Sequence, residues 1–324
     1  MSIWTFDKPQ EISKEADLLD YAESYLYNGY YEPPLNFSLF DKSTRSNTYN
    51  GSGMQVKRNI LLSTLVTSDV IERKTLKAVA HDYLTTGNAY LLIVKNILNK
   101  VVKLKHLPAL YMRVGEKQKH YYYLTGYTEH IKYPAHKIIH LSQNDMRQEI
   151  YGIPEWFAAV SSAMLSESAV LFRRKYYKNG AHAGFLLYIN NSKMGTEEEA
   201  LIQERLNSMR GLGNFRNLFI NARGTDKSKP ELIPVGQIDA KDEFLNVKNV
   251  TRDDILAAWR VPPSLMGIMP ANVGGFGDIK KAAEVFVINE ILPLQDEFLT
   301  INDITKTKIL TTKTYKLLEK NNEN

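Results

Sequence analysis

The chain has 324 residues, 44% of them hydrophobic and 24% charged, which is ordinary for a soluble globular protein of one elaborate domain or two smaller ones. It contains no cysteine, which excludes disulfide bonds, thiolate metal sites and cysteine nucleophiles and fits a reducing cytoplasm. A net charge of +5 permits contact with nucleic-acid phosphates but is too small to identify a dedicated nucleic-acid-binding protein.

The chain begins with a mostly irregular arm, which we expect to reach residue 58. Residues 1–19 lack the basic segment and apolar run of a secretory signal, and no later stretch approaches the roughly 20 apolar residues that span a bilayer. A soluble cytoplasmic product without a membrane partner is therefore expected. Asp41 to Gly53 is rich in Ser, Thr, Asn and Gly, which predicts a mobile loop because such a stretch buries little apolar surface.

A compact α+β unit is predicted over residues 72–145. Apolar residues recur at helical spacing from Glu72 to Thr86, and Gly87-Asn88 should end that helix. Apolar runs of strand length follow at Ala89–Val94, Val101–Val114 (broken at Pro108), Tyr121–Leu124, around Ile131 and at Lys137–Leu141. The 19 tyrosines of the chain fit either surfaces that become interfaces or ordinary α/β packing.

A long helix from Pro154 to Lys178 is the clearest predicted element. Pro154 suits a first helical position, and Glu155 beside it favours the positive end of the helix dipole. No breaker interrupts the pattern before Asn179-Gly180, which supplies the stop. At about 1.5 Å per residue the helix would span roughly 37 Å, well beyond the typical length of about 11–12 residues.

A small unit of one helix and about three strands is predicted next. The helix opens at Thr196 and ends at Gly211-Leu212-Gly213, and the strands lie at Phe185–Ile189, Asn217–Ile220 and Glu231–Val235. Thr251, with Asp254 three residues on, should then cap another helix. That helix must end near Val261 because two prolines follow.

The last part of the chain contains a glycine-rich segment and a second helical run. Pro270–Asp278 is the glycine-rich segment, and Ile279–Leu299 is helical by pattern, with a kink expected at Pro293. The tail from Thr305, rich in Lys, Thr and Asn, is predicted to be peripheral.

Histidines with nearby acids raise the question of a metal or hydrolytic site. His136, His140 and Asp145 lie close in sequence, but the apolar residues between the histidines indicate a strand, and no third ligand is spaced to complete a site. Structural histidines are the favoured interpretation, with ligation as the alternative. His81-Asp82 is weaker still, since adjacent helical residues point to different sides.

Two basic segments have both a functional and a structural interpretation. Lys280 and Lys281 fit either contact with passing phosphates or a solvated helix face. The cluster of Arg173, Arg174, Lys175 and Lys178, with two tyrosines inside it, fits either a nucleic-acid or protein surface or charges that complement the dipole of their own helix.

The glycine-rich run before Lys280 faintly resembles a phosphate cradle, because it precedes a helix. Gly274-Gly275-Phe276-Gly277-Asp278 nevertheless lacks the G-x-x-x-x-G-K-[ST] arrangement, and no strong strand leads into it. A flexible loop is the better interpretation, and no enzyme signature is found in the chain.

Long sequence blocks resemble the PBSX-type portal proteins of tailed bacteriophages, in family order from about residue 30 to 297. They are Gly87-Asn88-Ala89-Tyr90, His106-Leu107-Pro108-Ala109-Leu110-Tyr111, Arg147-Gln148-Glu149-Ile150-Tyr151-Gly152 with Pro154-Glu155-Trp156, Phe172-Arg173-Arg174-Lys175-Tyr176-Tyr177, Asn179-Gly180-Ala181-His182-Ala183-Gly184-Phe185, Gly213-Asn214-Phe215-Arg216-Asn217-Leu218-Phe219, Thr251-Arg252-Asp253-Asp254-Ile255-Leu256, Val261-Pro262-Pro263 and Gly274-Gly275-Phe276-Gly277-Asp278. The N-terminal arm is short for this family, and the tail after Thr300 carries no such motif.

The resemblance implies a homo-oligomeric ring, typically of twelve copies, at one capsid vertex. Such a ring passes double-stranded DNA without reading it and docks the terminase large subunit, the head-completion and tail connector proteins, and capsid or scaffold protein. It implies a non-catalytic protein without cofactor or metal, found in the virion and, during assembly, in the host cytoplasm.

The resemblance also implies an α+β plan of wing, long-helix stem, small α/β clip and kinked channel helix. Its parts are an N-terminal arm (1–29), wing (30–150), first stem helix (151–182), clip (183–236), returning strand and stem helix (237–268), tunnel loop (269–278), channel helix and wing (279–304) and tail (305–324). The DNA-facing residues implied are Asn272, Gly274, Gly275, Phe276, Gly277, Lys280 and Lys281.

Two other classes of function stay open beside this one. Asp253, Asp254 and Glu284 could be the carboxylates of a metal-dependent nuclease or phosphotransferase, although the aspartates also fit a first helical turn. A nucleic-acid-binding module outside phages would instead show tight, strongly salt-dependent binding as a monomer.

Overall fold

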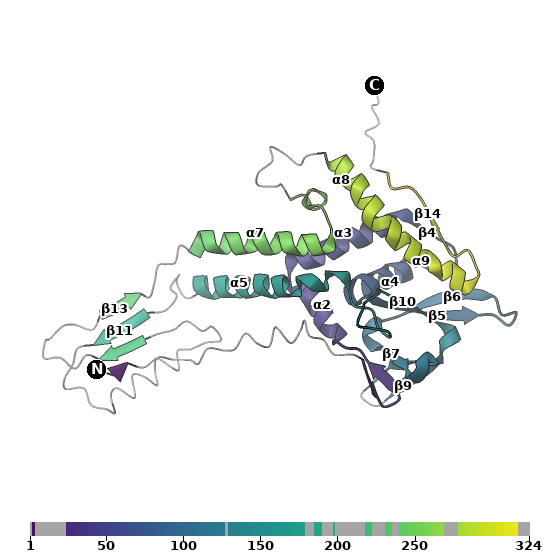
Figure 1. Cartoon of the computed structure of the whole chain (residues 1–324), viewed down its shortest axis with the longest axis horizontal. Coiled ribbons are helices and arrows are strands. Elements are labelled where there is room, and N and C mark those ends of the chain that lie inside the picture. Colours follow the sequence, from purple (N-terminus) through teal and green to yellow (C-terminus); the bar gives the residue numbers. More distant parts are fainter. Residues whose placement is uncertain are drawn as a thin grey trace, which may run out of the picture. The chain divides into compact units, whose positions relative to one another are not determined.

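A computed structural model describes residues 2–3, 24–126, 129–178, 185–189, 197, 218–221, 231–234, 240–268 and 278–316 (Figure 1). The chain divides into two compact units. Unit 1 holds residues 1–17 and 165–250, and unit 2 holds residues 18–164 and 251–324. The boundaries fall within two helices, α5 (Val160–Lys178) and α7 (Ala240–Trp259).

Unit 1 contains a four-stranded sheet in the order β1-β12-β11-β13. Its strands are β1 (Ser2–Ile3), β11 (Phe185–Ile189), β12 (Leu218–Asn221) and β13 (Glu231–Pro234). β11 and β12 are parallel and the other pairs antiparallel. The three strands predicted here are confirmed. Of the helix predicted to open at Thr196, only Glu197 belongs to the described residues, and it is helical.

The described residues of unit 2 form three antiparallel sheets. Their strands, in spatial order, are β10 (Ile138–Ser142), β5 (Asn88–Lys95) and β6 (Val101–Leu107) in the first; β2 (Tyr25–Tyr27), β3 (Tyr30–Glu32), β7 (Met112–Gly115), β8 (His120–Leu124) and β9 (His130–Pro134) in the second; β14 (Leu310–Thr312) and β4 (Leu65–Thr67) in the third. Short 3-10 turns lie at η1 (Ala109–Tyr111), η2 (Glu116–Gln118), η3 (Ala135–Lys137) and η5 (Pro263–Met266). The strands predicted between residues 89 and 141 are confirmed, as is the interruption at Pro108.

The prediction of an irregular arm up to residue 58 is wrong. Two helices, α2 (Phe37–Ser46) and α3 (Thr48–Thr64), occupy the stretch expected to be a mobile loop. The side chain of Asn36 accepts a hydrogen bond from Ser38 N, and that of Asn47 accepts from Tyr49 N and Asn50 N. Each asparagine therefore caps a helix, which is the position that its short polar side chain favours.

Small residues in α3 serve close packing and are not a sign of disorder. A Cβ on Gly53 would lie 2.9 Å from Trp259 Cδ1, and a Cβ on Gly51 would collide with the backbone oxygen of Thr44. Asn50 is fully buried, and its Oδ1 accepts a 2.6 Å hydrogen bond from Trp259 Nε1. Polar composition here reflects a helix interface.

The helix α4 (Arg73–Thr86) ends as predicted at Gly87, whose φ of 72° is the left-handed cap that glycine provides at low cost. The predicted long helix is also confirmed, although its first turn is the 3-10 helix η4 (Glu155–Ala159) and regular α5 starts at Val160. The prediction that Thr251 caps a helix is wrong. α7 begins at Ala240, and Thr251 is a buried interior residue, 1% exposed.

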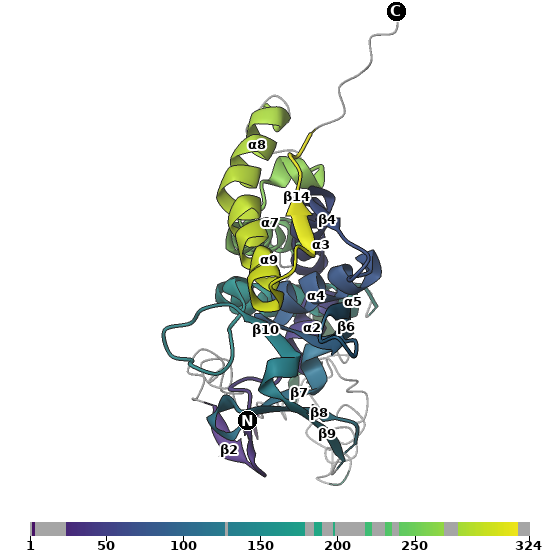
Figure 2. The same cartoon turned by 90° about the vertical axis from the view of Figure 1, so that its right-hand side faces the viewer.

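The second helical run is confirmed as α8 (Ile279–Phe286), a π-helical turn η6 (Val287–Ile291) and α9 (Leu292–Thr305) (Figure 2). Pro293 lies in the first turn of α9, so the expected distortion takes the form of the π turn before it. The prediction of a wholly peripheral tail is wrong. Ile309 and Leu310 are each 1% exposed, and β14 pairs with β4.

The core of unit 2 joins segments that are distant in sequence. Trp156 stacks on Trp259 with ring centroids 5.7 Å apart, and Phe40 meets Trp156 edge to face at 5.8 Å. Tyr83 meets Phe298 in the same way at 5.5 Å. Aromatic contacts of this kind add to the free energy of apolar burial, so helices α2, α4, α7 and α9 share one core.

Candidate functional site

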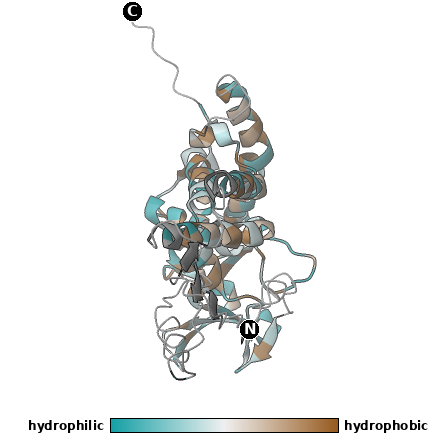
Figure 3. Cartoon of the chain, turned by 90° about the vertical axis from the view of Figure 1, so that its left-hand side faces the viewer, coloured by the Kyte–Doolittle hydropathy of each residue, from teal (hydrophilic) through white to brown (hydrophobic). Residues whose placement is uncertain are grey.

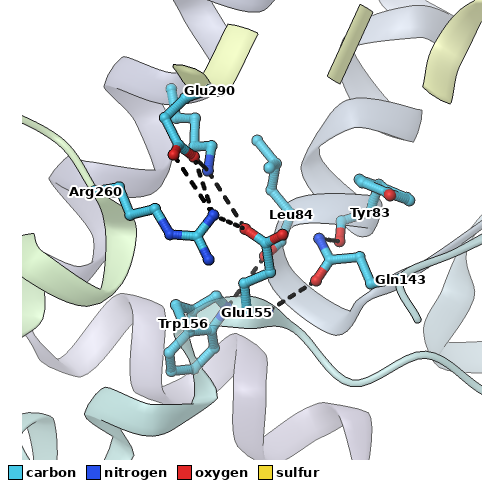
Figure 4. Close-up of polar contacts among 8 residues, drawn as sticks. Tyr83, Leu84, Gln143, Glu155, Trp156, Arg260 and Glu290 are labelled. Atoms are coloured by element: carbon cyan, nitrogen blue, oxygen red, sulfur yellow. Dashed lines mark hydrogen bonds and ion pairs between the residues drawn. The ribbon is translucent and has the colours of Figure 1, made fainter. Parts of the chain in front are cut away.

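Four charged residues from four segments meet in unit 2 where α3, η4, the end of α7 and η6 come together (Figure 4). Lys57 Nζ lies 2.8 Å from Glu290 Oε2 and 3.6 Å from Glu155 Oε2. Arg260 Nη1 lies 3.4 Å from Glu155 Oε2 and 3.5 Å from Glu290 Oε2. Lys57 and Glu290 are only 3% and 10% exposed, so this charge pair is removed from bulk water. We call these four residues the junction network.

The junction network is held by hydrogen bonds to the end of α4. The backbone N of Glu155 donates to Gln143 Oε1 over 2.8 Å, and Gln143 Nε2 donates to the carbonyl oxygen of Tyr83 over 3.3 Å. Trp156 Nε1 donates to the carbonyl oxygens of Leu84 and Thr85 at 3.1 and 3.2 Å. The carbonyl oxygens of Leu84 and Thr85, in the last turn of α4, thereby gain partners that a helix end does not supply itself.

Two members of the junction network sit on unusual backbone. Arg260 has a φ of 55°, a left-handed conformation that costs a residue with a side chain about 1 kcal/mol or more. Glu290 lies in the π turn, and such turns recur at functional positions in helices. The network ties η6, which lies between α8 and α9, to α3, η4 and the end of α7. Its two cations face two carboxylates, so the four charges balance.

The predicted tunnel loop is mostly outside the described residues, which is where Asn272, Gly274, Gly275, Phe276 and Gly277 lie. Lys280 and Lys281 are described, and both are exposed in the first turn of α8. Asp278 caps this helix by accepting a 3.1 Å hydrogen bond from Lys281 N, and its carboxylate lies 3.6 Å from Lys281 Nζ. The cap therefore holds the start of α8 in place beside the loop.

The basic cluster of α5 lies in unit 1 and is only partly described. Arg174 is exposed and Arg173 half-buried, while Lys175 and Lys178 are helical, with side chains outside the described set. Arg173 lines a small pocket together with Lys248 of α7. Positive charge from both helices therefore gathers at one place.

The predicted histidine group does not form a site. His140 stacks on Tyr90 with ring centroids 4.3 Å apart, and its Nε2 donates to Asn88 Oδ1 over 3.0 Å. Burial lowers the pKa of His140 to about 3, so the ring is neutral and structural. His136 is exposed on η3. Asp145 pairs through its backbone with Gln148 in a short bridge.

His81-Asp82 also divides between two structural roles. His81 Nδ1 accepts a 3.2 Å hydrogen bond from Arg58 Nη1, and burial lowers the pKa of His81. Asp82 faces the other way, with Oδ2 accepting from His106 Nε2 and from the backbone N of Ala109, both at 2.8 Å. The predicted separation of the two side chains is confirmed.

The three candidate carboxylates of a nuclease form no metal site among the described residues. Asp254 Oδ2 accepts a 2.9 Å hydrogen bond from Ser162 Oγ, which joins α7 to α5, and Asp253 pairs with Arg252 at 2.8 Å. Glu284 is exposed on α8. Within the described ranges, no group of three or more His, Cys, Asp or Glu side chains could hold a metal ion. The same part of the chain has no helix long and apolar enough to cross a membrane.

Comparison with known proteins decides the family. The family model described as phage portal protein matches residues 46–300. The probable portal protein of Escherichia phage P2 is 37% identical over 317 residues, which cover 98% of this chain and 92% of the relative. That of Haemophilus phage HP1 (strain HP1c1) is 35% identical over 272 residues, covering 82% and 79%. The chain belongs to the phage portal protein family.

The fold is shared with solved structures as well. The crystal structure of an HK97 family phage portal protein from Corynebacterium diphtheriae aligns with a TM-score of 0.58 at 14% identity, covering 83% of this chain and 93% of that chain. A chain in the neck of the native gene transfer agent (GTA) particle, computed with C12 symmetry, aligns with a TM-score of 0.63 at 17% identity. The alignment covers 94% of this chain and 89% of that chain. The predicted family and the predicted α+β portal fold are both confirmed.

The junction network of this portal-family chain is not predicted from the sequence. Lys57 and Glu290 are 233 positions apart, and Arg260 lies next to Val261, where a helix was predicted to end. A weak signal existed at Lys57, because it lies in a helix whose neighbouring turns bury Met54, Leu61 and Leu62. A charge on a buried helix face calls for a partner, but the sequence does not say which.

Proposed function

We propose that the chain forms a ring, of twelve copies, that serves as the conduit for DNA packaging and ejection at one vertex of a phage capsid. The observation that carries this proposal is the match to the P2 relative, which spans nearly the whole of both chains. In this proposal the protein is structural and catalyses no reaction. The different partners of Asp253 and Asp254, Arg252 and Ser162, support that part of it.

Exposed apolar side chains support assembly into a ring. Val285, Ile288 and Leu292, on α8, η6 and α9, are 56%, 60% and 44% exposed, and brown hydrophobic residues stand among the teal polar ones on α8 in Figure 3. In unit 1, Leu165 and Leu171 are 54% and 47% exposed on α5. A closed ring needs two different faces on each subunit, and apolar surfaces on both units are available to form them.

The parts of the subunit follow the plan of the family. We assign residues 30–150 to the wing, 151–182 and 237–268 to the stem, 183–236 to the clip, 269–278 to the tunnel loop and 279–304 to the channel helix. Residues 1–29 and 305–324 are assigned to the terminal arms, although the first contributes β1 and β2 and the second contributes β14. The α5–α7 pair, tied by Ser162 and Asp254, supports the assignment of the stem.

Contact with DNA is expected to be weak and independent of base sequence, because tight binding would stall a moving duplex. The residues assigned to it are Lys280, Lys281 and the tunnel loop, with the basic end of α5 as a further contact. The proposed protein partners are the terminase large subunit and connector proteins at the clip and capsid or scaffold protein elsewhere. The subunit would assemble in the host cytoplasm and remain in the virion.

Two experiments test this proposal. Mass photometry and negative-stain microscopy of the purified full chain should show rings of several hundred kilodaltons, and a chain that stays monomeric even with capsid and scaffold proteins would count heavily against a portal. Deleting residues 271–277 should leave rings intact but impair DNA packaging or retention. Loss of assembly on that deletion would instead make the segment structural.

A further inference from the structure

Positive charge is concentrated in one segment of unit 2. Residues 83–137 contain nine Lys and Arg residues against two acids, Glu116 and Glu129, a net charge of +7 where the whole chain carries +5. The remainder of the chain is therefore slightly acidic. All nine cations lie between Lys95 and Lys137, in β5 to β9 and the turns between them, and not in the helices proposed to meet DNA.

The turn between β5 and β6 presents two large aliphatic side chains to solvent. Ile97 is 104% exposed and Leu98 is 76% exposed. The turn itself is well braced, since Asn96 N donates to Lys100 O, Asn99 N donates to Asn96 O, and Lys100 N donates to Asn96 Oδ1, all within 3.0 Å. Asn99 supplies a left-handed φ of 61°, a conformation that asparagine tolerates. The turn between β5 and β6 lies at the right-hand end of Figure 1. Its bracing keeps the two apolar side chains exposed.

A cavity of about 400 Å³ opens at the base of the same turn. Its apolar lining comes from Leu92, Ile93, Val94 and Tyr133, and its polar lining from Lys95, Asn99, His136 and Lys137. Lys95 and Lys137 are exposed, and neither has an ion pair with any described carboxylate. Asn99, which directly follows Leu98, joins the cavity to the tip of the turn.

We propose that this surface, made of the turn 96–99 and the adjoining cavity, binds an acidic segment of another protein that carries an apolar side chain. The apolar side chain would enter the cavity, the acids would meet Lys95 and Lys137, and Ile97 and Leu98 would cover the apolar part of the segment. Fully exposed aliphatic groups beside an apolar pocket mark a protein interface. Charge complementarity then selects an acidic partner.

Neither DNA nor a second copy of this surface fits as well. A phosphate backbone makes no use of Ile97, Leu98 or an apolar cavity, and contact with it needs only the charges. A second copy of the same turn would bring Lys95 and Lys100 towards another cationic rim, which repels it. Lys103 and Lys105 do not bear on the proposal. They stand on the edge strand β6, where lysine deters strand pairing, and Lys103 already pairs with Glu72 at 2.6 Å.

The proposal extends beyond the DNA conduit and can be tested without DNA packaging. The probe is an array of short synthetic peptides in which acidic content and apolar content vary independently, incubated with the full-length chain. Binding is expected to rise only where acids and an apolar side chain occur together. On those peptides, Lys95→Glu with Lys137→Glu should weaken binding at least about tenfold, and so should Ile97→Ser with Leu98→Ser.

The matched control is Lys74→Glu with Lys77→Glu, which makes the same charge change on exposed positions of α4 and should leave peptide binding as in the wild type. All substituted side chains are exposed, so thermal unfolding should be unchanged. Equal loss in the control, binding to acidic peptides regardless of apolar content, or absence of binding across the array would overturn the proposal. A DNA duplex bound through the same four residues, or cross-linking of the turn to a second copy, would replace it.

Discussion

Removing Glu290 tests whether burial makes the junction network important for the free energy of unfolding. The substitution Glu290→Leu leaves the Lys57 ammonium, 3% exposed, with only Glu155 at 3.6 Å. Glu155 is 48% exposed, so solvent screens it and it compensates the buried charge poorly. Leaving a buried charge without its partner costs about 3–5 kcal/mol of the free energy of unfolding.

The reverse substitution should cost less, because the carboxylate keeps a second cation. In Lys57→Met, Glu290 still faces Arg260 at 3.5 Å, so we expect a loss of about 1–3 kcal/mol. The double variant Lys57→Met with Glu290→Leu removes both buried charges and should cost at most about 2 kcal/mol, far less than the sum of the single changes. Arg260 and Glu155 remain paired at 3.4 Å in it.

Guanidinium unfolding followed by tryptophan fluorescence measures these differences directly. Trp156 and Trp259 are 1% and 3% exposed and stacked on each other, so their emission reports the core next to the network. The control is Lys103→Met, which breaks an ion pair of 2.6 Å that is shorter than the Lys57–Glu290 pair but about half exposed on both sides. That change should cost no more than about 1 kcal/mol.

Two results would refute the reasoning about the junction network. If Glu290→Leu lowers the free energy of unfolding no more than the Lys103→Met control does, burial does not increase the contribution of the Lys57–Glu290 pair. If the double variant costs the full sum of the single variants, Lys57 and Glu290 do not act as a pair. Both outcomes can be read from the same unfolding curves.

Three further predictions follow from contacts elsewhere in the chain. Gly53→Ala should lower the free energy of unfolding by about 1–3 kcal/mol, because the new Cβ would lie 2.9 Å from Trp259 Cδ1; stability equal to a Ser52→Ala control would contradict this. The pKa of His140 is lowered to about 3 from an ordinary value near 6.5, so its contribution is present above pH 6.5 and is lost at about 1.4 kcal/mol per pH unit as the pH falls towards 3. A His140→Gln variant should flatten unfolding stability against pH in that window, and an unchanged slope would assign it to other groups. Arg173→Glu with Arg174→Glu should disturb stem packing or DNA passage, scored as packaged DNA per particle, and unchanged packaging would remove any role from that cluster.

The spacing of apolar residues predicted the helices and strands that bury one apolar face. It failed for helices that pack through polar and small residues. The α4 helix was found because Leu76, Val79, Ala80 and Tyr83 repeat at helical spacing, and all are buried. The α2–α3 pair was missed because its contacts use Asn50, Gly51 and Gly53, which resemble a loop by composition. Asn36 and Asn47 are N-cap residues that could have indicated these two helices, but the loop-like composition around them favoured a loop.

A second readable signal was the Asn28-Gly29 pair between two tyrosine-rich runs. Both residues have positive φ, 51° and 82°, as a tight hairpin turn requires, and they join β2 to β3. The β4–β14 pairing could not be read in the same way, because strands of three residues give too short a pattern and their partners lie far apart in sequence. The junction network could not be predicted for the same reason, since its members lie far apart in sequence and come together only in the folded chain.

The net charge of the chain concealed its most informative electrostatic feature. At +5 over 324 residues, a weak general affinity for phosphate was the natural interpretation, and Lys280, Lys281 and the end of α5 were its predicted contacts. The segment 83–137, which builds β5 to β9, carries a larger excess of +7 and also exposes Ile97 and Leu98. A conduit gains nothing from apolar side chains beside such charge, whereas a protein-docking surface needs both. In a portal subunit, therefore, positive charge does not by itself mark the path of DNA, and the apolar neighbours of each cation decide which partner it serves.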